Sequence, residues 1–404
     1  MSKHSFILIL LLFALATHPG FGRHRYQLKG HVRDAQTLAP LSAANIRVLG
    51  TSRGTVINVD GAFVLLIDSG YCSLAVTSLG YKSDSISMSL SSDTTHDFFL
   101  VPSEILFPEI VVTSEDPAIG IVQRAIENKR IWIEKLHSFE MDAFTRQVLM
   151  RDSSIAGITE AFTKGYWQQN DTLREIIRQR RQTQNIQMQF NFASVGRILN
   201  FNDDVIRFLG YSFVGPTAQE ALDYYNYKLI RTRSSYGREI YDILVIPRSR
   251  TTPLFDGTIS IADSSFALMG VDVQPNEAFQ IPFVTQKHLR YQQQFGLYDE
   301  QFWLPADIRI DGKFKVGAMG FSLPLISFNQ TSVISDYSIN GPIPDSIFHK
   351  PRLQIDSSAA TVDSIFWSKT IVLPLSDEEL NAYRTLDSTQ TLEVQFRPGG
   401  ISAQ

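Results

Sequence analysis

The sequence has 404 residues, of which 44% are hydrophobic, 19% charged and 11% aromatic, a composition typical of folded globular proteins and sufficient for two or three cores. Lys and Arg number 37 against 41 Asp and Glu, so the net charge of −4 offers no basic field for binding nucleic acid. The single cysteine, Cys72, excludes an internal disulfide and a cysteine-based zinc site.

Residues 1–22 have the organisation of a secretory signal peptide. Lys3 and His4 precede the apolar run Phe6–Ala16, and Gly20-Phe21-Gly22 then supplies a small-residue cleavage site. The apolar run is well short of the roughly 20 residues that a membrane-spanning helix needs. We therefore predict an exported protein that resides in the periplasm or at an outer membrane.

Residues 23–102 carry the alternating pattern of half-buried β-strands. Tyr26, Leu28, Gly30 and Val32 are each separated by one polar residue, which places them on one face of a strand. The same period recurs in three later runs: Ile46 and Val48, then Cys72, Leu74 and Val76, then Ile86, Met88 and Leu90. We predict a compact antiparallel sandwich in which Cys72 is a buried apolar residue and not a reactive thiol.

This segment resembles the carboxypeptidase-regulatory-like domain. The resemblance rests on Gly30-His31-Val32-Arg33-Asp34, Pro40-Leu41, Ala44-Asn45-Ile46, Gly50-Thr51, Gly54-Thr55, Asp60-Gly61-Ala62-Phe63 and Gly80-Tyr81. It implies a seven-stranded, transthyretin-like β-sandwich that is an accessory domain with a binding or spacer role. Ile57-Asn58 departs from the Thr-Asp that the family pattern has before the Asp-Gly turn.

Residues 103–136 are expected to link two β-rich regions. Glu109–Thr113 reads as a strand, and Asp116-Pro117 has the residue types of a helix N-cap and first turn. Apolar side chains then recur at helical spacing at Ala118, Val122, Ala125, Ile126, Ile133 and Leu136. Such a stripe favours a helix packed on a core over a cofactor-binding or membrane-surface helix.

Residues 137–350 are predicted to be mostly strands. The clearest runs are Asp242–Pro247, Gly257–Asp263, Phe266–Val273 and Phe302–Pro305, interrupted by two short helical windows at Asp203–Leu209 and Thr217–Tyr225. The simplest architecture is a strongly curved antiparallel sheet that carries a few helices. The predicted fold class is therefore mainly β, with an N-terminal sandwich followed by this curved region.

The second region also resembles a known family. The matching residues are Asp116-Pro117-Ala118, Ala125-Ile126-Glu127-Asn128-Lys129, Glu175-Ile176-Ile177, Arg181-Gln182-Thr183, Gly215-Pro216, Asp223-Tyr224-Tyr225-Asn226-Tyr227, Ile246-Pro247-Arg248, Phe255-Asp256-Gly257, Phe366-Trp367, Leu373-Pro374-Leu375-Ser376 and Glu379. They are similar to an uncharacterised Gram-negative outer-membrane family of unknown function, in which a β-rich periplasmic region leads into a C-terminal β-barrel. Residues 351–404 are the tail that leads to this barrel in the family. Because the sequence ends at Gln404, the resemblance implies a truncated or split member.

Two fragments have the spacing of catalytic motifs. His137 and Glu140 fit the H-x-x-E spacing of zinc carboxypeptidases, but the third ligand would have to be His288 or His349, and a surface His137–Glu140 pair is the better interpretation. Gly50–Gly54 matches the G-x-S-x-G string around Ser52, but it lies between two predicted strands, which favours a hairpin turn. We assign no catalytic, cofactor-binding or metal-binding residue and expect no cofactor.

Two clusters of charged residues are expected to have structural roles. Arg174, Arg178, Arg180 and Arg181 alternate with apolar and polar residues, which predicts the solvated face of a strand, with contact to acidic lipid headgroups or glycan phosphates as an alternative. The carboxylates at 203–204 and 377–379 are expected at helix starts, where negative groups favour the helix dipole.

Three functions are compatible with these features. The first is a non-enzymatic exported module of a cell-envelope or outer-membrane assembly that binds an outer-membrane protein, another envelope component or a surface polymer. The second is a lipid or lipoprotein carrier with a half-open β-barrel, which a pocket lined only by Phe, Leu and Ile would favour. The third is a zinc-dependent or serine hydrolase, which lacks a recognisable third catalytic partner.

Overall fold

The structure is a computed structural model of the chain. It describes residues 25–42, 44–51, 53–78, 81–102, 116–196, 200–235, 238–318 and 321–397. The predicted signal peptide and the predicted strand Glu109–Thr113 lie outside these ranges.

The N-terminal region is a β-sandwich. Its strands are β1 (Arg25–Asp34), β2 (Asn45–Val48), β3 (Gly54–Val56), β4 (Ala62–Asp68), β5 (Gly70–Thr77), β6 (Asp84–Leu90), β7 (Thr94–Thr95) and β8 (Phe98–Leu100). One sheet has the order β4-β1-β7 with β8 also on β1, and the other has the order β3-β2-β5-β6. Both β7 and β8 pair with β1 in parallel, so the expectation of a purely antiparallel sandwich is wrong at this edge. The reason is that the last stretch of chain crosses from β6 to the opposite sheet and runs alongside β1.

The alternating residues of the sequence form the sandwich core. Its buried side chains include Leu28, Val32, Ile46, Phe63, Leu74, Val76 and Phe98. Cys72 is a free, buried cysteine of the same core, as predicted, and burial raises the pKa of its thiol. The prediction of an unreactive, buried cysteine is consistent with this environment.

Across the described residues, a 12-stranded sheet forms the second region. Its order is β14-β15-β16-β17-β18-β19-β21-β9-β10-β11-β22, with β20 paired to β19. The bounds are β9 (Ser138–Arg151), β10 (Ser154–Gln168), β11 (Arg174–Gln182), β14 (Tyr225–Ser235), β15 (Arg238–Pro247), β16 (Phe255–Ala262), β17 (Leu268–Pro275), β18 (Val284–Tyr298), β19 (Phe302–Ala318), β20 (Phe321–Ser322), β21 (Ile326–Ile339) and β22 (Leu353–Ile355). The strand pairs are antiparallel except that β22 is parallel to β11. The mainly β fold class, with a sandwich followed by a large antiparallel region, is confirmed.

Helix α2 (Pro117–Ile133) begins where the sequence predicts. Asp116 Oδ1 accepts hydrogen bonds from the backbone N–H groups of Ala118, at 2.9 Å, and of Leu229 on the edge strand β14, at 3.1 Å. The apolar stripe, including Val122 and Ile126, is buried against the sheet. The cap residue therefore also satisfies a backbone donor at the sheet edge, which limits unwanted pairing there.

The windows at 203–209 and 217–225 differ from the expected helices. Val205–Phe208 is strand β12, paired with β13 (Tyr211–Val214), so the first helix is wrong, and only α3 (Ala221–Tyr224) forms within the second. Asp204 accepts from the buried Lys129 of α2 at 2.7 Å instead of starting a helix. The ammonium group of Lys129 also donates to the backbone carbonyls of Asn202 and Thr217, so tertiary contacts set this conformation.

The C-terminal segment, residues 340–397, packs against strands β10 and β11 of the large sheet. It contains 3-10 turns η2 (Asp345–Ile347) and η3 (Ser357–Ala360) and helices α4 (Ser364–Lys369), α5 (Asp377–Thr385) and α6 (Leu392–Gln395). Ser376 and Glu379 form a capping box at the start of α5, which confirms the carboxylates at 377–379 as helix-start charges.

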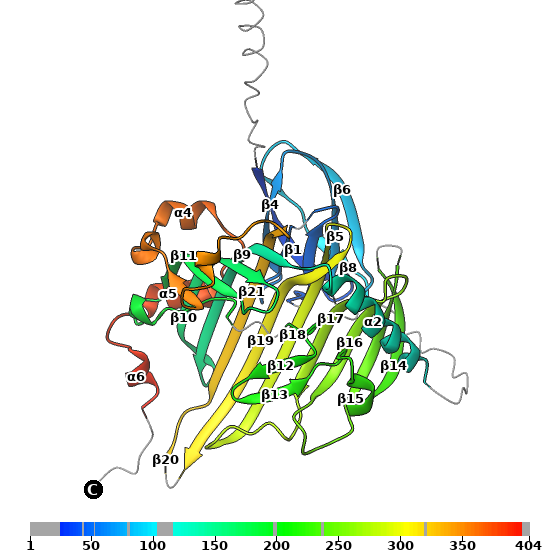
Figure 1. Ribbon diagram of the computed structural model, residues 1–404. Coiled ribbons are helices and arrows are strands. Elements are labelled where there is room, and N and C mark those ends of the chain that lie inside the picture. Colours follow the sequence, from blue (N-terminus) through cyan, green and yellow to red (C-terminus); the bar gives the residue numbers. More distant parts are fainter. Residues whose placement is uncertain are drawn as a thin grey trace, which may run out of the picture.

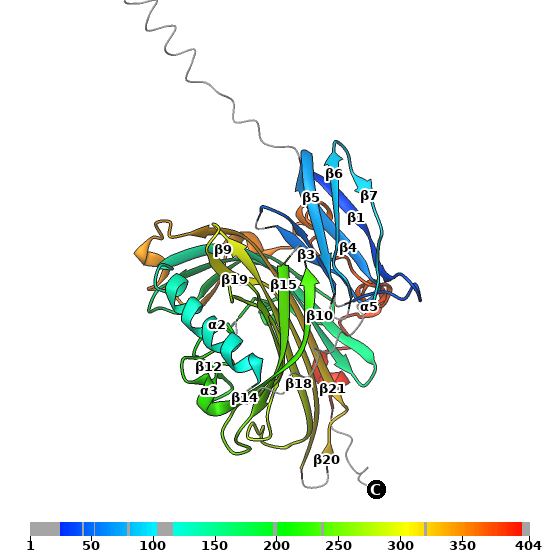
Figure 2. The same ribbon diagram turned by 90° about the vertical axis from the view of Figure 1, so that its right-hand side faces the viewer.

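Figure 1 shows the sandwich at one end of the molecule and the tip of β19 and β20 at the other. Figure 2 shows that the large sheet is curved, with α2, α3 and β12 on one side and the sandwich on the other. Among the described residues, none of the helices combines the length and the apolar character that crossing a bilayer requires.

Candidate functional site

The central strands of the sheet present two different faces. On β16, Ile259 and Ile261 belong to the hydrophobic core, whereas Thr258 and Ser260 line a cavity on the other face. This division follows from the two-residue period of a strand. The face toward α2 is apolar and filled, and the face toward the sandwich is polar and open.

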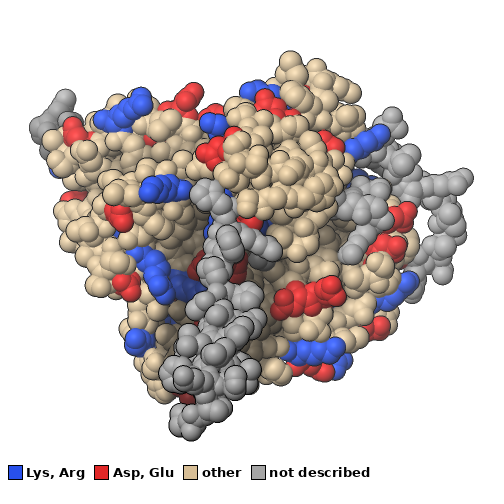
Figure 3. Space-filling model, turned by 90° about the horizontal axis from the view of Figure 1, so that it is seen from above, with Lys and Arg blue, Asp and Glu red and all other residues tan. Residues whose placement is uncertain are grey.

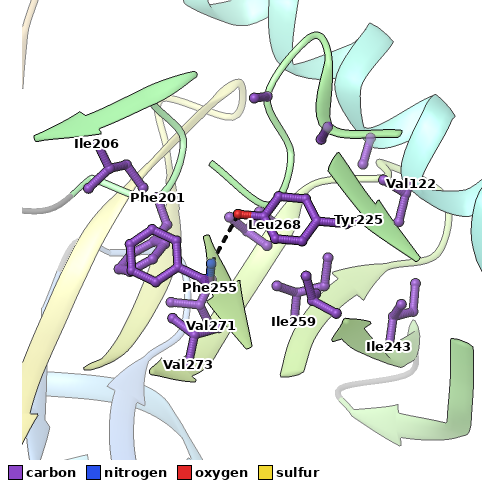
Figure 4. Packing of buried hydrophobic residues seen from close by; sticks show 14 of the residues in the cluster. Val122, Phe201, Ile206, Tyr225, Ile243, Phe255, Ile259, Leu268, Val271 and Val273 are labelled. Atoms are coloured by element: carbon purple, nitrogen blue, oxygen red, sulfur yellow. Dashed lines mark hydrogen bonds between the residues drawn. The ribbon is translucent and has the colours of Figure 1, made fainter. Parts of the chain in front are cut away.

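Aromatic side chains fill the space between the sheet and α2. The buried rings of this cluster are Phe201, Phe208, Phe213, Tyr225, Phe255 and Phe279. Phe208 and Phe213 stack with centroids 4.7 Å apart, and Phe213 stacks on Phe255 at the same distance. Figure 4 shows the Tyr225 ring pointing toward Phe255, where its hydroxyl accepts a hydrogen bond from Phe255 N at 3.2 Å. This face of the sheet is a packed core.

A cavity of about 790 Å³ lies between the sandwich and the opposite face of the sheet. From the sandwich it is lined by Asn45, Arg47, Val48, Leu49, Gly50, Thr51, Thr77 and Ser78. From the sheet it is lined by residues that include Arg233, Ile240, Thr258, Ser260, Met269, Gly270, Asp272, Gln292 and Gln294. We call this space the junction cleft. Small residues on β16 and β17 leave it open, and its volume is within the range of ligand-binding pockets.

Specific hydrogen bonds hold the two walls of the junction cleft together. Asn45 Nδ2 donates to Gln294 Oε1 at 2.5 Å. Arg309 on β19 donates to the backbone carbonyls of Ser42 at 2.5 Å and Ala44 at 3.1 Å. Because one guanidinium group spans two carbonyls of the same loop, the contact fixes both the distance and the orientation of the sandwich.

Arg47 extends from β2 of the sandwich into the sheet. A Cβ atom at Gly296 would overlap its Nη1, so the glycine makes room for the guanidinium. Nη2 of Arg47 is buried and lacks a hydrogen-bond partner among the described residues. Arg47 lines the cleft together with Asp307, a carboxyl group whose pKa is raised by burial. An unpaired buried donor of this kind costs free energy unless an acceptor reaches it.

Two charged cleft-lining residues of the sheet, Asp272 and Arg233, form ion pairs within the protein. Arg290 donates to both carboxylate oxygens of Asp272, at 2.6 and 2.5 Å. The buried Asp242 accepts from Arg231 at 2.7 Å and from Ser260 Oγ at 2.6 Å. Figure 3 shows the molecule from above, with acidic and basic residues scattered and neither sign forming a large patch. The cleft is lined by three arginines and four carboxylates beside hydroxyl, amide and apolar groups, so its charges of opposite sign nearly cancel.

The residues of the hydrolase hypothesis do not converge. His137 Nδ1 lies 3.4 Å from Gln169 Oε1, and Glu140 pairs with Lys164 at 3.4 Å, so the expected His137–Glu140 surface pair is wrong. The strand that begins at Ser138 gives both side chains nearer partners across the sheet. His288 is on β18 and His349 follows η2, where its ring nitrogen contacts the carbonyl of Asp345. Within the residues described, no cluster of three or more His, Cys, Asp or Glu has the arrangement of a metal site.

The G-x-S-x-G string lies in a strand-to-strand connection. Gly54 pairs with Arg47 across β2 and β3, and Thr51 N donates to Val48 O within the turn. Ser52 itself lies outside the described residues. A nucleophile elbow requires a strand followed by a helix, so the hairpin interpretation of this string is confirmed.

Three of the four arginines of β11 make contacts within the protein. Arg180 is buried and donates to the carbonyls of Ala359 and Asn191. Arg181 binds Glu160, and Arg174 donates to Phe348 O. The predicted solvated strand face is therefore wrong at these three positions, because the C-terminal segment covers it. Only Arg178 of the four is exposed.

The residues that build the junction cleft were missed by motif reasoning. Asn45 and Arg47 flank the apolar Ile46 on β2, so their alternation marks an outward face. This signal exists in the sequence, but it does not tell which surface that face meets. The 249-residue separation of Asn45 and Gln294 explains why no local motif contains the site.

Two sequence families match the chain. Residues 28–112 match the CarboxypepD_reg-like domain, in agreement with the sandwich. Residues 121–337, more than half of the 404 residues, match the family of unknown function DUF5686. The chain belongs to the DUF5686 family. The match spans α2 and the sheet from β9 to most of β21, the parts that carry the packed core and one wall of the cleft.

Several solved structures are similar at a low level. A LolA superfamily protein from Nitrosomonas europaea has 14% identity and a TM-score of 0.27, covering 58% of this chain and 97% of its own. A putative outer membrane lipoprotein-sorting protein domain from Vibrio parahaemolyticus has 9% identity and a TM-score of 0.30, covering 57% and 96%. The MucA/MucB complex from Pseudomonas aeruginosa has 10% identity and a TM-score of 0.18, covering 56% and 100%. No curated protein matches the sequence. At these scores the likeness assigns no function to the DUF5686 chain.

Proposed function

We propose that this DUF5686 protein is a non-enzymatic, exported module of the cell envelope and that the junction cleft is its partner-binding site. The observation that carries the proposal is the cavity of about 790 Å³ between the sandwich and the sheet. The predicted signal peptide supports export. Scattered histidines and the absence of a recognisable nucleophile motif in context support a binding role over catalysis.

The lining of the cleft favours an uncharged polypeptide segment of an envelope protein as the occupant. Leu49, Ile240 and Met269 provide apolar contact, whereas Thr258 and Gln292 provide hydrogen-bonding groups. A peptide carries both apolar side chains and backbone carbonyls, so it can use both kinds of lining group. A polyhydroxylated polymer would use the polar groups but would leave the apolar wall without complementary contacts.

The packing on the two faces of the large sheet argues against the lipid-carrier alternative. The open cavity contains Arg47, Asp272 and several amides, so it is not the pocket of Phe, Leu and Ile that would favour a carrier. The corresponding apolar space beside α2 is occupied by the protein's own rings. The binding module is therefore the better supported of the two functions.

Site-specific crosslinking tests the proposal. Leu49 is half-exposed on the cleft wall, so a photoreactive benzoylphenylalanine can replace it there. After irradiation of cells of the source organism, this residue should form a crosslinked adduct. The adduct should contain peptides of one envelope protein. Gly270→Leu should reduce this adduct severalfold, because a Cβ there has no neighbour closer than 3.5 Å and the added side chain occupies the cleft without a backbone clash.

Matched controls separate occupancy from folding. Gly120→Leu on the exposed side of α2 makes the same substitution where no atom beyond the adjoining helix backbone lies within 4 Å of the new Cβ, and it should leave the adduct unchanged. An adduct that contains glycan and no peptide would assign the cleft to a surface polymer. An adduct that persists at full yield in Gly270→Leu would show that the cleft is not the site.

We infer that the protein acts at the outer membrane, and separation of the inner and outer membranes of the source cells tests this location. Elemental analysis and a peptide-cleavage assay test the hydrolase alternative. If the protein bound stoichiometric zinc and cleaved peptides, and if His137→Ala abolished both properties, the proposed binding function would be wrong.

A further inference from the structure

Strands β18 and β19 project beyond the rest of the fold at the end where β18 begins and β19 ends, opposite the turn that joins them. Val284 at the start of β18 pairs with Val316 of β19, and β19 continues to Ala318, where it pairs with the short strand β20. Gly317 N donates to Phe283 O at 3.0 Å, which fixes residue 283 beside this tip. Figures 1 and 2 both show β20 at the end of the molecule farthest from the sandwich. We call Ile281–Val284 and the described side chains of Val316 and Leu323–Ile326 the sheet tip.

The sheet tip exposes an apolar side chain that folding does not explain. Phe283 is 70% exposed and has a φ of 63°, a backbone conformation in which Gly or Asn is favoured and a bulky residue is uncommon. Neither core packing nor turn geometry therefore requires phenylalanine at this position. Pro282 beside it is also exposed, and Val284, Val316 and Leu323 are only partly buried.

The described residues of the sheet tip beside Phe283 carry no charged side chain, and basic residues lie behind them on β19. Val316 and Leu323–Ile326 include no Asp, Glu, Lys or Arg. Lys313 and Lys315 follow on the same strand, both exposed, and two residues apart so that they lie on one face of β19. Among the described residues, no carboxylate forms an ion pair with either lysine. Elements that contact a membrane from one side have this arrangement, with apolar side chains at the end and lysines without ion-pair partners behind them.

We propose that the sheet tip inserts into the surface of a lipid bilayer that carries anionic headgroups, with Phe283 in the acyl-chain boundary and Lys313 and Lys315 at headgroup phosphates. This membrane contact goes beyond the proposed partner binding and uses the opposite end of the molecule. The whole chain has a net charge of −4, so attraction to an anionic surface comes from the local lysines. Lys313 and Lys315 give the sheet tip a positive charge that is complementary to anionic headgroups.

Fluorescence at the tip tests insertion. The chain has one cysteine, Cys72, which is buried, so Phe283→Cys can be labelled selectively with an environment-sensitive nitrobenzoxadiazole dye. With vesicles of phosphatidylglycerol and phosphatidylcholine, the dye emission should increase and shift to the blue. The same label at Tyr71→Cys, a 77% exposed position on the sandwich, should not respond. Equal responses at the two positions would overturn the proposal.

Co-sedimentation with the same vesicles tests the two groups separately. The combined variant Lys313→Gln and Lys315→Gln should weaken binding by roughly fivefold per lysine and reduce its salt dependence. The charge-matched control Lys82→Gln and Lys369→Gln, on the exposed sandwich surface and on α4, should bind like the wild type. Phe283→Ser should lose binding while keeping the wild-type melting curve, since the side chain makes little contact with the core.

Three results would overturn the membrane contact. They are wild-type protein that stays in the supernatant with anionic vesicles, a Phe283→Ser variant that binds undiminished, and concentration-dependent self-association that Phe283→Ser abolishes in the absence of lipid. None of these bears on the Leu49 adduct in the junction cleft, so the two proposals fail independently.

Discussion

The hydroxyl of Tyr383 in α5 donates a 2.7 Å hydrogen bond to Oε2 of Glu160, a carboxylate at 0% exposure in the middle of β10. Arg181 donates to the same oxygen at 2.5 Å, and Arg146 Nε donates to Oε1 at 2.8 Å. Burial alone would raise the pKa of Glu160, but the two guanidinium groups hold it below its usual range. The C-terminal segment thus supplies one of the three side chains that donate hydrogen bonds to this buried carboxylate.

Removal of the Tyr383 hydroxyl should therefore destabilise the fold. Tyr383→Phe deletes one hydrogen bond to a buried charge, and we expect a loss of about 1.5 to 3 kcal/mol in the free energy of unfolding. Urea denaturation followed by circular dichroism measures this loss. Tyr71→Phe removes the same atom from a 77% exposed side chain and should change stability by less than about 0.5 kcal/mol. Equal effects of the two variants would contradict a stabilising role for the hydrogen bond from Tyr383 to Glu160.

Glu175 should make stability depend on pH in the opposite sense from an ordinary ion-paired carboxylate. Burial raises its pKa from 4.5 to about 7, although Gly196 N, Val195 N and Thr163 Oγ1 donate to it at 2.7, 2.9 and 3.1 Å. The folded state therefore binds a proton that the unfolded state releases near its ordinary pKa. This contribution to stability is present at low pH and is lost as pH rises through the window from 4.5 to about 7.

The measurement is the unfolding free energy of the wild type and of Glu175→Gln between pH 5 and pH 8. A shift from 4.5 to about 7 corresponds to about 3 kcal/mol, so the wild type should lose up to that much more than the variant across the range. Parallel pH profiles for the two proteins would show that Glu175 has an ordinary pKa in the folded state.

The signal peptide prediction has a direct readout. Cleavage after Gly20-Phe21-Gly22 should expose a new N-terminus near Arg23 on protein recovered from the periplasm. N-terminal sequencing identifies that residue. An intact Met1 on folded protein would contradict export.

The sandwich should fold when it is separated from the sheet. It has its own core around Leu28 and Phe98, and many of its contacts with the sheet are hydrogen bonds, such as those from Arg309. We expect a fragment of residues 23–101 to melt cooperatively, and residues 109–404 to keep β-sheet circular dichroism with a lower melting temperature. The loss arises because Val56 of the sandwich shares a small cluster with Trp367 and Leu373. A remainder that unfolds and aggregates would show one shared core.

Parts of the fold could be read from local sequence because local chemistry decides them. The alternation at Leu28 and Val32, the Asp116 cap and the carboxylates that begin α5 each depend on residues within one element. Val205–Phe208 could not be read in this way. Asp203 and Asp204 look like a helix start, but the buried ammonium group of Lys129, far away in the chain, holds this segment as a hairpin.

The sequence by itself determined the mainly β class, the sandwich, the packed helix and the absence of a disulfide, because periodicity, capping and composition are local or global properties of the chain. Only the tertiary structure decided where the polar groups meet. Asn45 and Gln294 are 249 residues apart, and Glu160 and Tyr383 are 223 residues apart, yet each pair shares a hydrogen bond. A strand pattern shows that a polar residue points away from its own core, but it carries no information about the surface opposite. That surface depends on how the sandwich, the sheet and the C-terminal segment pack together. This packing forms the junction cleft and gives three β11 arginines their partners within the protein.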